Sequence, residues 1–142
     1  MPEPMTPERC REFLAAGSLS GVLAVVRSDG RPHATPLWYA LDGEDLLINV
    51  GAQTVKGRAI AAEPRVTLCV HEDKAPYNFV MVEGTAEIST DPDEIRRGAT
   101  EIGRRYLPAE ALDGYVGYAT SPGTVGVRIR VDRMVGIDSV AG

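Results

Sequence analysis

Short hydrophobic runs and alternation of hydrophobic with polar positions dominate the chain, and both patterns are typical of β-strands. They occupy residues 21–26, 33–41, 46–50, 65–71, 79–88 and 124–132, and a last strand ends near residue 137. Asp-Gly pairs at 29–30 and 42–43 separate the first three segments, and this dipeptide favours tight hairpin turns. The sequence therefore predicts that the first three strands form an antiparallel meander, with 33–41 as its second strand.

Helices are predicted where a capping residue precedes a helical spacing of hydrophobic positions. Thr6, followed by a proline, begins a short helix that closes at Gly17. Residues 54–62 carry apolar side chains at helical spacing and are stopped by a proline. The sequence Asp-Pro-Asp-Glu at 91–94 is the strongest helix start, and we expect that helix to run to about Leu107. The glycine-rich stretch that follows is loosely helical.

Six or seven mostly antiparallel strands in so short a chain can hide their edges best by closing into a barrel. The predicted fold class is therefore mainly β, a split antiparallel β-barrel with the helix after the third strand and the 91–107 helix packed outside. Residues 1–142 are expected to form a single domain, because this length leaves too little chain for two independent cores.

Charge and composition narrow the classes of function. A net charge of -5 and a pI near 5.0 argue against an extended nucleic-acid surface, although a local basic pocket for a small anion remains possible. No apolar run reaches the roughly 20 residues that span a bilayer, and the start lacks the features of a signal peptide, so a cytoplasmic protein without membrane contact is expected. Cys10 and Cys69 are expected to be reduced thiols, and His71 with two neighbouring carboxylates lacks the spacing of a metal site.

The first candidate site is the start of the predicted helix at 54–62. Lys56 falls in its first turn, where a cation opposes the positive end of the helix dipole and is better tolerated when an anion is bound. Thr54 can cap the helix and offer a hydroxyl, Gly57 can let a ligand approach the backbone, and Arg58 adds a second cation. These residues predict a phosphate or carboxylate cradle. A solvated helix end with two ordinary surface cations is the alternative.

The second candidate site is the strand at 33–41. Alternation places His33, Thr35, Leu37 and Tyr39 on one face, with Pro36 and Trp38 on the other. Because proline cannot donate to a ladder, this strand must be an edge or be bulged. An interrupted ladder beside the sole tryptophan, His33 and Thr35 suits the rim of a flat aromatic ligand or cofactor, whereas core or dimer contacts are the alternative.

Other catalytic patterns are missing from the sequence. It has no nucleophile elbow, dinucleotide-binding motif or P-loop, and no residue can be assigned as a catalytic acid or base. The arginine pairs at 96–97 and 104–105 are expected to form a solvated helix face.

Four segments in order, GVLAVV, DGRPHATPLW, LLINV and KGRAIAAEPRV, follow the first helix. Together they resemble the pyridoxamine 5'-phosphate oxidase-like split β-barrel superfamily, and look most like its actinobacterial branch that uses the deazaflavin coenzyme F-420. The resemblance covers about residues 14–137. Its most specific element is Lys56 with Arg58, followed by Glu-Pro-Arg-Val at 63–66.

The resemblance implies a homodimer with two cofactor sites at its interface, each built from both chains. It places three groups of residues around the cofactor: Thr35, Pro36, Leu37 and Trp38 along the tricyclic ring; Val50, Gly51 and Ala52 against it from the third strand; and Thr54, Lys56 and Arg58 on the phosphate-bearing tail. The partner chain would supply Tyr77, Asn78 and Phe79. The exposed aromatic residues independently favour a homodimer, because one thin barrel cannot cover them.

Two departures separate this sequence from the authentic oxidase. That enzyme carries an arginine and a lysine on its second strand region and ends in Arg-Leu-x-Pro, whereas this strand has neither cation and the chain ends Ser-Val-Ala-Gly. Oxidation of pyridoxamine phosphate is therefore not expected. The resemblance implies hydride transfer between coenzyme F-420 and an unsaturated small molecule. An FMN-dependent oxidoreductase of the same fold, or a protein that binds flavin, deazaflavin or haem without turnover, is the alternative.

Overall fold

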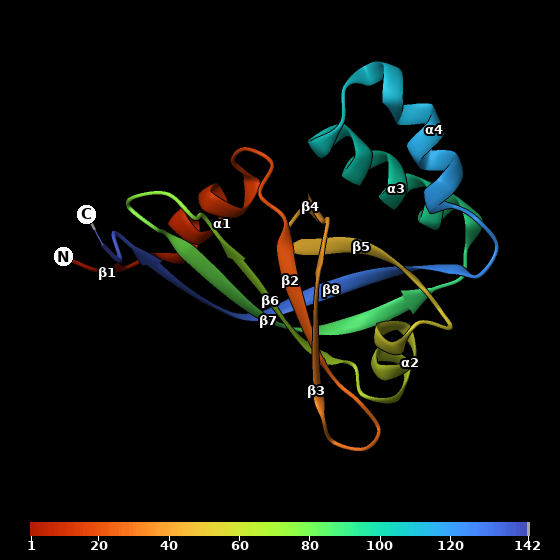
Figure 1. Cartoon of the computed structure of the whole chain (residues 1–142), viewed down its shortest axis with the longest axis horizontal. Helices are drawn as coiled ribbons and strands as arrows, with labels where there is room; N and C mark the ends of the chain where they lie inside the picture. The colour runs from red at the N-terminus through yellow and green to blue at the C-terminus, as the bar shows by residue number, and fades with distance from the viewer. Residues whose placement is uncertain (142) are drawn as a thin grey trace.

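A strongly curved antiparallel sheet with helices at its margins makes up the structure, a computed structural model (Figure 1). It describes residues 1–141, so Gly142, the last residue of the predicted domain, lies outside the described residues. The strands are β1 (Glu3–Pro4), β2 (Gly21–Val26), β3 (Pro32–Leu37), β4 (Ala40–Asp42), β5 (Asp45–Gly51), β6 (Arg65–His71), β7 (Phe79–Ser89) and β8 (Thr124–Asp138). The helices are α1 (Pro7–Ala15), α2 (Val55–Ala62), α3 (Pro92–Tyr106) and α4 (Ala109–Ala119).

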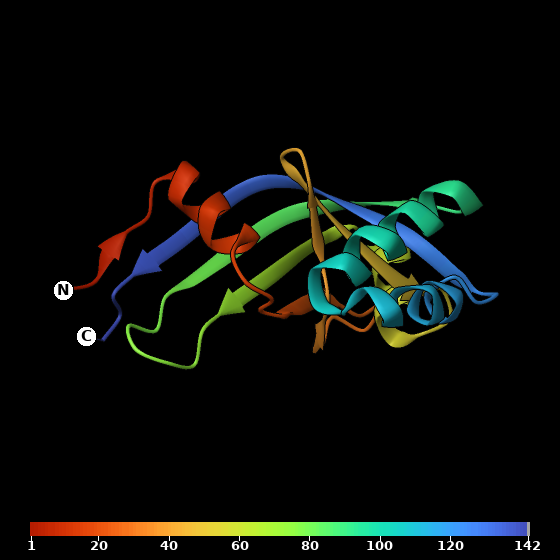
Figure 2. The ribbon, with the colours of Figure 1, turned by 90° about the horizontal axis from the view of Figure 1, so that it is seen from above.

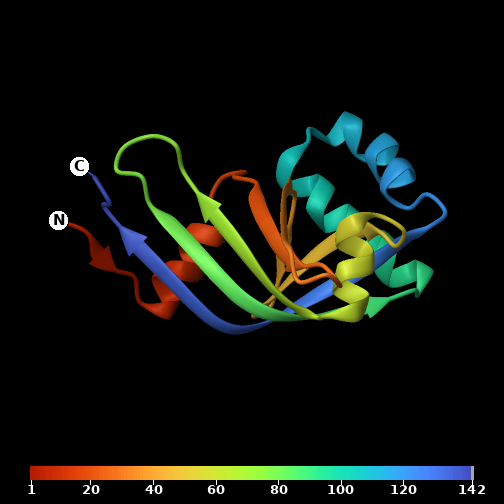
Figure 3. The same ribbon diagram turned by 60° about the horizontal axis from the view of Figure 1, so that its bottom comes forward.

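The strands follow the order β3-β2-β6-β7-β8-β5-β4, and β1 pairs with the end of β8. Every pairing is antiparallel, and the two ends of the path, β3 and β4, are consecutive in the chain. The sheet therefore curls back on itself, as Figure 3 shows. The predicted mainly β split barrel is confirmed, with eight strands in the described residues instead of six or seven.

The predicted second strand is broken, and this corrects the meander. The hairpin of β2 and β3 forms as expected, with Gly30 at φ 84° in its turn. However, the ladder stops after Leu37, and the chain resumes pairing at Ala40 with β5 on the opposite side of the sheet. Trp38 and Tyr39 lie between the two strands, and the ring of Tyr39 is fully buried. β3 is thus an edge strand, as its proline predicted.

The core lies on the concave face of the sheet. Leu23 and Val25 from β2 meet alternate residues of the neighbouring strands, including Leu68 and Val82, and these side chains are almost completely buried. α2 packs against β2 and β5 and adds Ile60 to this core. α2 and the α3–α4 pair lie towards one end of the sheet, whereas both termini lie at the other (Figure 2).

Side-chain caps fix the starts of α1, α2 and α3. The hydroxyl of Thr6 accepts a hydrogen bond from the backbone of Arg9 at 3.1 Å, and Asp91 accepts one from Asp93 at 2.9 Å. The predicted helix from Asp91 is confirmed, since α3 ends at Tyr106. The loosely helical stretch after it is an ordered helix, α4, which packs against α3.

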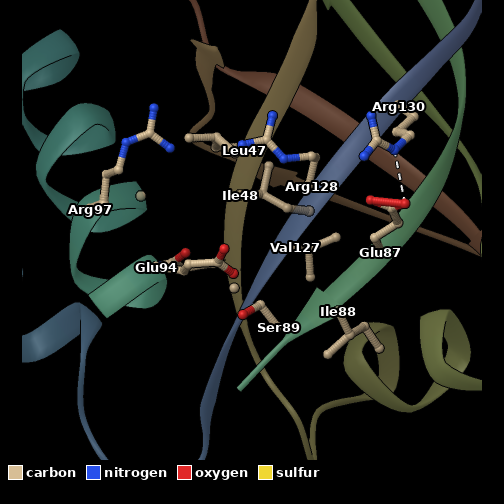
Figure 4. A pocket seen from close by; sticks show the side chains of 13 residues that line it. Leu47, Ile48, Glu87, Ile88, Ser89, Glu94, Arg97, Val127, Arg128 and Arg130 are labelled. Carbon is tan, nitrogen blue, oxygen red and sulfur yellow. Dashed lines mark hydrogen bonds and ion pairs between the residues drawn. The ribbon is translucent and has the colours of Figure 1, made fainter. Parts of the chain in front are cut away.

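A network of ion pairs ties α3 to the outer face of β4, β5 and β8. Asp42 accepts hydrogen bonds from Arg97 at 2.7 Å and Arg128 at 2.6 Å, and Asp45 accepts from Arg128 at 3.2 Å. Arg130 binds Glu87 at 2.8 Å beside them (Figure 4). These arginines line a cavity of about 340 Å³, but each already has a carboxylate partner. The positive charge of the arginines in this cavity is therefore already neutralised by carboxylates of the chain.

The bonds from Arg97 and Arg128 hold the pKa of Asp42 at about 2, below its ordinary value of 3.8. Because the folded state lowers this pKa, the network stabilises the fold fully above about pH 4 and less as the pH falls towards 2. We predict that Asp42→Asn lowers Tm at pH 7 by about 3 °C, for a loss of about 1 kcal/mol. The difference from wild type should shrink as melts are recorded at successively lower pH.

Glu12→Gln is the control, because Glu12 is exposed and its contact with Arg9 is long, at 4.0 Å. It should melt like the wild type at every pH. A Tm difference for Asp42→Asn that stays constant down to pH 3 would contradict the assigned role of its carboxylate.

Candidate functional site

The start of α2 uses the predicted cap to seal its own backbone. The Thr54 hydroxyl accepts a hydrogen bond from the Gly57 amide at 3.1 Å and donates one to the Gly51 carbonyl at 2.7 Å. Its single hydrogen is therefore committed within the chain. The cap is the role that the structure shows for Thr54, and its contact with a ligand stays a prediction.

Gly57 has a different function from the one expected. It is buried, and a Cβ at this position would overlap the carbonyl oxygen of Gly51 and lie 3.0 Å from that of Ala52. The space that a side chain would take is thus filled by the chain's own backbone at the end of β5. The prediction that Gly57 admits a ligand is wrong, because the glycine lets α2 dock on β5.

Two cations at the start of α2 remain without a partner. Lys56 and Arg58 make no ion pair or side-chain hydrogen bond with any of residues 1–141. Arg58 lines a cavity of about 290 Å³ together with Arg27 and Ser28, which come from the turn between β2 and β3. Arg27 has only a 4.0 Å contact with Asp29. Sequence reasoning missed Arg27, because only the fold brings that turn to α2.

The inner face of β3 carries an unsatisfied polar group. Thr35 pairs with Leu23 of β2 and points with it towards the core, while His33 pairs with Val25. The Thr35 hydroxyl is buried and has no hydrogen-bond partner in the described part of the chain. Leaving such a group unpaired costs about 1–3 kcal/mol, so this position calls for a partner from outside.

Trp38 stands in an aromatic cluster that joins the strand break to α3 and α4. Its ring stacks on Tyr106 with centroids 4.6 Å apart and planes 10° apart, and it meets Tyr115 at 5.5 Å and 42°. A cavity of about 400 Å³ opens beside it, lined by Pro36, Leu37, Trp38, Asn49, Ile102, Tyr115 and Tyr118. Burial raises the pKa of Tyr115, so its hydroxyl stays a hydrogen-bond donor at neutral pH.

Arg105 corrects the prediction of a solvated arginine face on α3. Its guanidinium lies 4.5 Å from the ring centroid of Tyr39 and 5.3 Å from that of Tyr106. It donates to the Tyr39 hydroxyl at 2.9 Å and to the Ala15 carbonyl at 3.1 Å. Arg96, Arg97 and Arg104 are exposed as expected, although Arg97 pairs with Asp42 and Arg104 with Glu101.

The remaining predicted residues fall into two places. Val50 turns its side chain into the core, so only Gly51, the last residue of β5, and Ala52, directly after it, are left to contact a ligand near α2. Tyr77 and Asn78 lie in the loop between β6 and β7, and Phe79 pairs with Ile137 near the end of β8. This loop lies at the end of the sheet that carries the termini, away from α2 (Figure 3). One chain therefore does not bring these three residues to the others.

Asn78 is held by hydrogen bonds within one chain, to Glu72 before its loop and to Ser139 after β8. Its backbone amide donates to Glu72 at 3.1 Å, and its side-chain oxygen accepts from Ser139 at 2.7 Å. The side chain is 8% exposed, so a contact with a second chain would use its exposed neighbour Tyr77 more readily.

Neither thiol nor metal chemistry finds support in the described residues. No group of three His, Cys, Asp or Glu side chains among residues 1–141 is placed to hold a metal ion. Cys10 and Cys69 are free thiols, as expected, and burial raises the pKa of both. Among the same residues, none of the helices has the length and apolar character required to cross a membrane.

Comparison with known families gives a match over nearly the whole chain. The model of the family described as pyridoxamine 5'-phosphate oxidase matches residues 6–137. Among solved structures, a conserved hypothetical protein from Mycobacterium tuberculosis is 26% identical, with a TM-score of 0.81 over 96% of this chain and 86% of that chain.

Two further structures carry informative names. A protein named F-420 reductase is 28% identical, with a TM-score of 0.66 over 87% of this chain and 94% of that chain. A heme binding protein from Mycobacterium smegmatis is 22% identical, with a TM-score of 0.75 over 97% of this chain and 56% of that chain. The second likeness concerns the fold alone.

The docking of α2 on β5 can be tested with two glycines of similar helical context. Gly57→Ala should destabilise the protein by about 1–3 kcal/mol, because the new methyl group meets rigid backbone. Gly114 in α4 has nothing within 4 Å of the position of an added Cβ. Gly114→Ala should therefore be neutral, or stabilising by up to about 1 kcal/mol. Urea unfolding of the two variants checks this, and equal stabilities would refute the close contact.

Proposed function

Because the chain belongs to the pyridoxamine 5'-phosphate oxidase family, we propose that it is an oxidoreductase that uses coenzyme F-420. It would transfer hydride between this deazaflavin and an unsaturated small molecule. The observation that carries the proposal is the pair of unpartnered cations, Lys56 and Arg58, at the start of α2 beside the cavity that Arg27 shares.

The distribution of charge supports binding of a deazaflavin cofactor and argues against oxidation of pyridoxamine phosphate. The segment from His33 to Trp38 has no arginine or lysine, so the candidate partners for an anionic cofactor tail are Lys56 and Arg58 of α2. An anionic tail is the ligand that such a cluster suits, since helix N-termini and arginines both favour phosphate. The F-420 reductase that is 28% identical to this chain supports the same cofactor.

The residues present fit such a cofactor. A ring carbonyl or N–H group would satisfy the buried Thr35 hydroxyl, for which the described residues supply no partner. Pro36, Leu37 and Trp38 would lie along the ring, and the backbone at Gly51 and Ala52 would border it. Lys56 and Arg58 would hold the phosphate-bearing tail.

When bound, the deazaflavin supplies the hydride chemistry itself. The chain's own contribution would be positioning and exclusion of water. Trp38 is well suited to this, since the stacking on Tyr106 fixes its ring in one orientation. A rigid aromatic wall beside the cofactor would shield the reacting atoms from water. This role needs no side chain that donates a proton.

We predict that Lys56→Ala weakens deazaflavin binding roughly tenfold to a hundredfold, as expected for one charge-assisted contact. The melting temperature without ligand should stay unchanged or rise slightly, because the unpaired cation opposes the positive helix end. Titrations of wild type and variant with coenzyme F-420, FMN and haem, followed by absorbance, measure the first part. Thermal melts of the free proteins measure the second.

Arg96→Ala is the matched control, since Arg96 is an exposed cation on α3 and should leave binding unchanged. Equal deazaflavin affinities for wild type and Lys56→Ala would remove Lys56 from the site. A clear preference of the wild type for FMN would keep the cradle but reject F-420. Tight haem binding without deazaflavin binding would favour a protein that binds haem without turnover.

We also propose that the protein is a homodimer in which the partner chain supplies the loop from Tyr77 to Phe79. The support is a row of apolar side chains across five paired strands on the outer face of the sheet. The row consists of Pro36, Val22, Cys69, Met81 and Val135. None of these five residues is fully buried within the described chain, so a second copy would remove this apolar surface from water.

Light scattering should report a dimer at micromolar concentration for the wild type. Met81→Glu places a charge in the middle of the apolar row and should yield a monomer, because an unpaired buried carboxylate is costly. Arg96→Glu adds a carboxylate on α3 instead and should remain dimeric. A monomeric wild type, or a dimeric Met81→Glu, would reject this interface.

A further inference from the structure

The aromatic cavity beside Trp38 is distinct from the basic start of α2 and has no assigned occupant. Its walls come from β3, β5, α3 and α4, and its volume is about 400 Å³. Tyr118, one turn after Tyr115 on α4, is 79% exposed and is the most exposed aromatic side chain in residues 1–141. A ligand that covers a large aromatic ring at the rim of a cavity removes apolar surface from water, and this lowers the free energy of the complex.

We propose that this cavity binds the hydride acceptor, and that the acceptor is a planar conjugated molecule of one or two rings held beneath Tyr118. The assignment rests on the proposed function, since Pro36, Leu37 and Trp38 border both the expected cofactor ring and this cavity. The acceptor would thus lie next to the ring without sharing the cations of the tail site.

The fixed side of the cavity is preorganised. Trp38 keeps one face on Tyr106, whose hydroxyl donates to the Leu19 carbonyl at 2.9 Å and accepts from the Tyr39 amide at 3.4 Å. Tyr106 therefore cannot turn without breaking these two hydrogen bonds, and the face of Trp38 that stacks on it is supported by a fixed ring. Flat aromatic walls favour flat ligands, because stacking requires parallel or offset planes.

The opposite side is adjustable, because α4, although an ordered helix, is buried at only one position. Gly114 and Gly117 lie within it, and nothing stands within 4 Å of the position of an added Cβ at either. Packing does not require these glycines, and each lowers helix stability. No side chain caps the N-terminus at Pro108, and Val116 is the one residue of α4 that is buried. Tyr118 can therefore move over an acceptor of variable size.

The sole tryptophan gives a direct assay without cofactor. The protein is titrated with 2-methyl-1,4-naphthoquinone while tryptophan fluorescence is recorded, and 1-decalone, a two-ring ketone without a flat ring system, is the matched probe. We expect saturable quenching by the quinone and no saturable response to the decalone. Tyr118→Ala should weaken quinone binding about tenfold, whereas Tyr118→Phe, which keeps the ring, should bind like the wild type.

The outcomes separate this proposal from the assignment of the cofactor. Quenching that does not saturate, or equal quinone affinities for Tyr118→Ala and wild type, would overturn the acceptor site. Equal affinities for the quinone and the decalone would overturn the preference for planar molecules. Saturable quinone binding that depends on Tyr118, in a protein that fails to bind deazaflavin, would keep the cavity as a planar-ligand site and reject the proposed cofactor.

Discussion

The contact of Arg105 with Tyr39 and Tyr106 determines how the two edges of the sheet are joined. Its guanidinium lies over both rings and bonds to the Tyr39 hydroxyl, which in turn donates to the Leu14 carbonyl at 2.7 Å. One cation thereby links α1, α3 and the segment between β3 and β4. A desolvated cation–π contact is worth about 2 kcal/mol, which helps to offset the Arg105 Nε that is left without a partner. The strand break and the orientation of Trp38 both follow from this arrangement.

The same contact explains where the sequence predicted the fold and where it could not. β2 and β6 begin and end where their hydrophobic patterns do, and the capping residues place the starts of α1, α2 and α3, because these signals are local. Alternation through Leu37, Tyr39 and Leu41 is unbroken, so it indicates one strand. The break comes instead from Tyr106, which is 67 positions away and takes the Tyr39 amide out of the ladder. Local periodicity contains no information about such a partner.

The candidate site divides along the same line. Thr54, Lys56 and Arg58 lie within five consecutive residues, so a cap followed by two cations can be recognised in the sequence. Arg27, Tyr115 and Tyr118 come from a turn and a helix with no such pattern, and only the curl of the sheet brings them to the cavities. Gly57 shows the converse error, since a glycine near a candidate site is also what close packing of a helix on a strand requires.

Pairing, more than the number of cations, distinguishes arginines committed to the fold from cations that are free to meet a ligand in this acidic protein. Arg97, Arg128 and Arg130 line the groove of Figure 4, yet Asp42, Asp45 and Glu87 already neutralise them. An anion entering that groove would have to compete with carboxylates held by the fold. Lys56 and Arg58 have no such competitor within the described chain, so an incoming phosphate gains the full attraction of both. Lys56 and Arg58 at the start of α2 are therefore available to an incoming anion, whereas the arginines of the Figure 4 cavity are not.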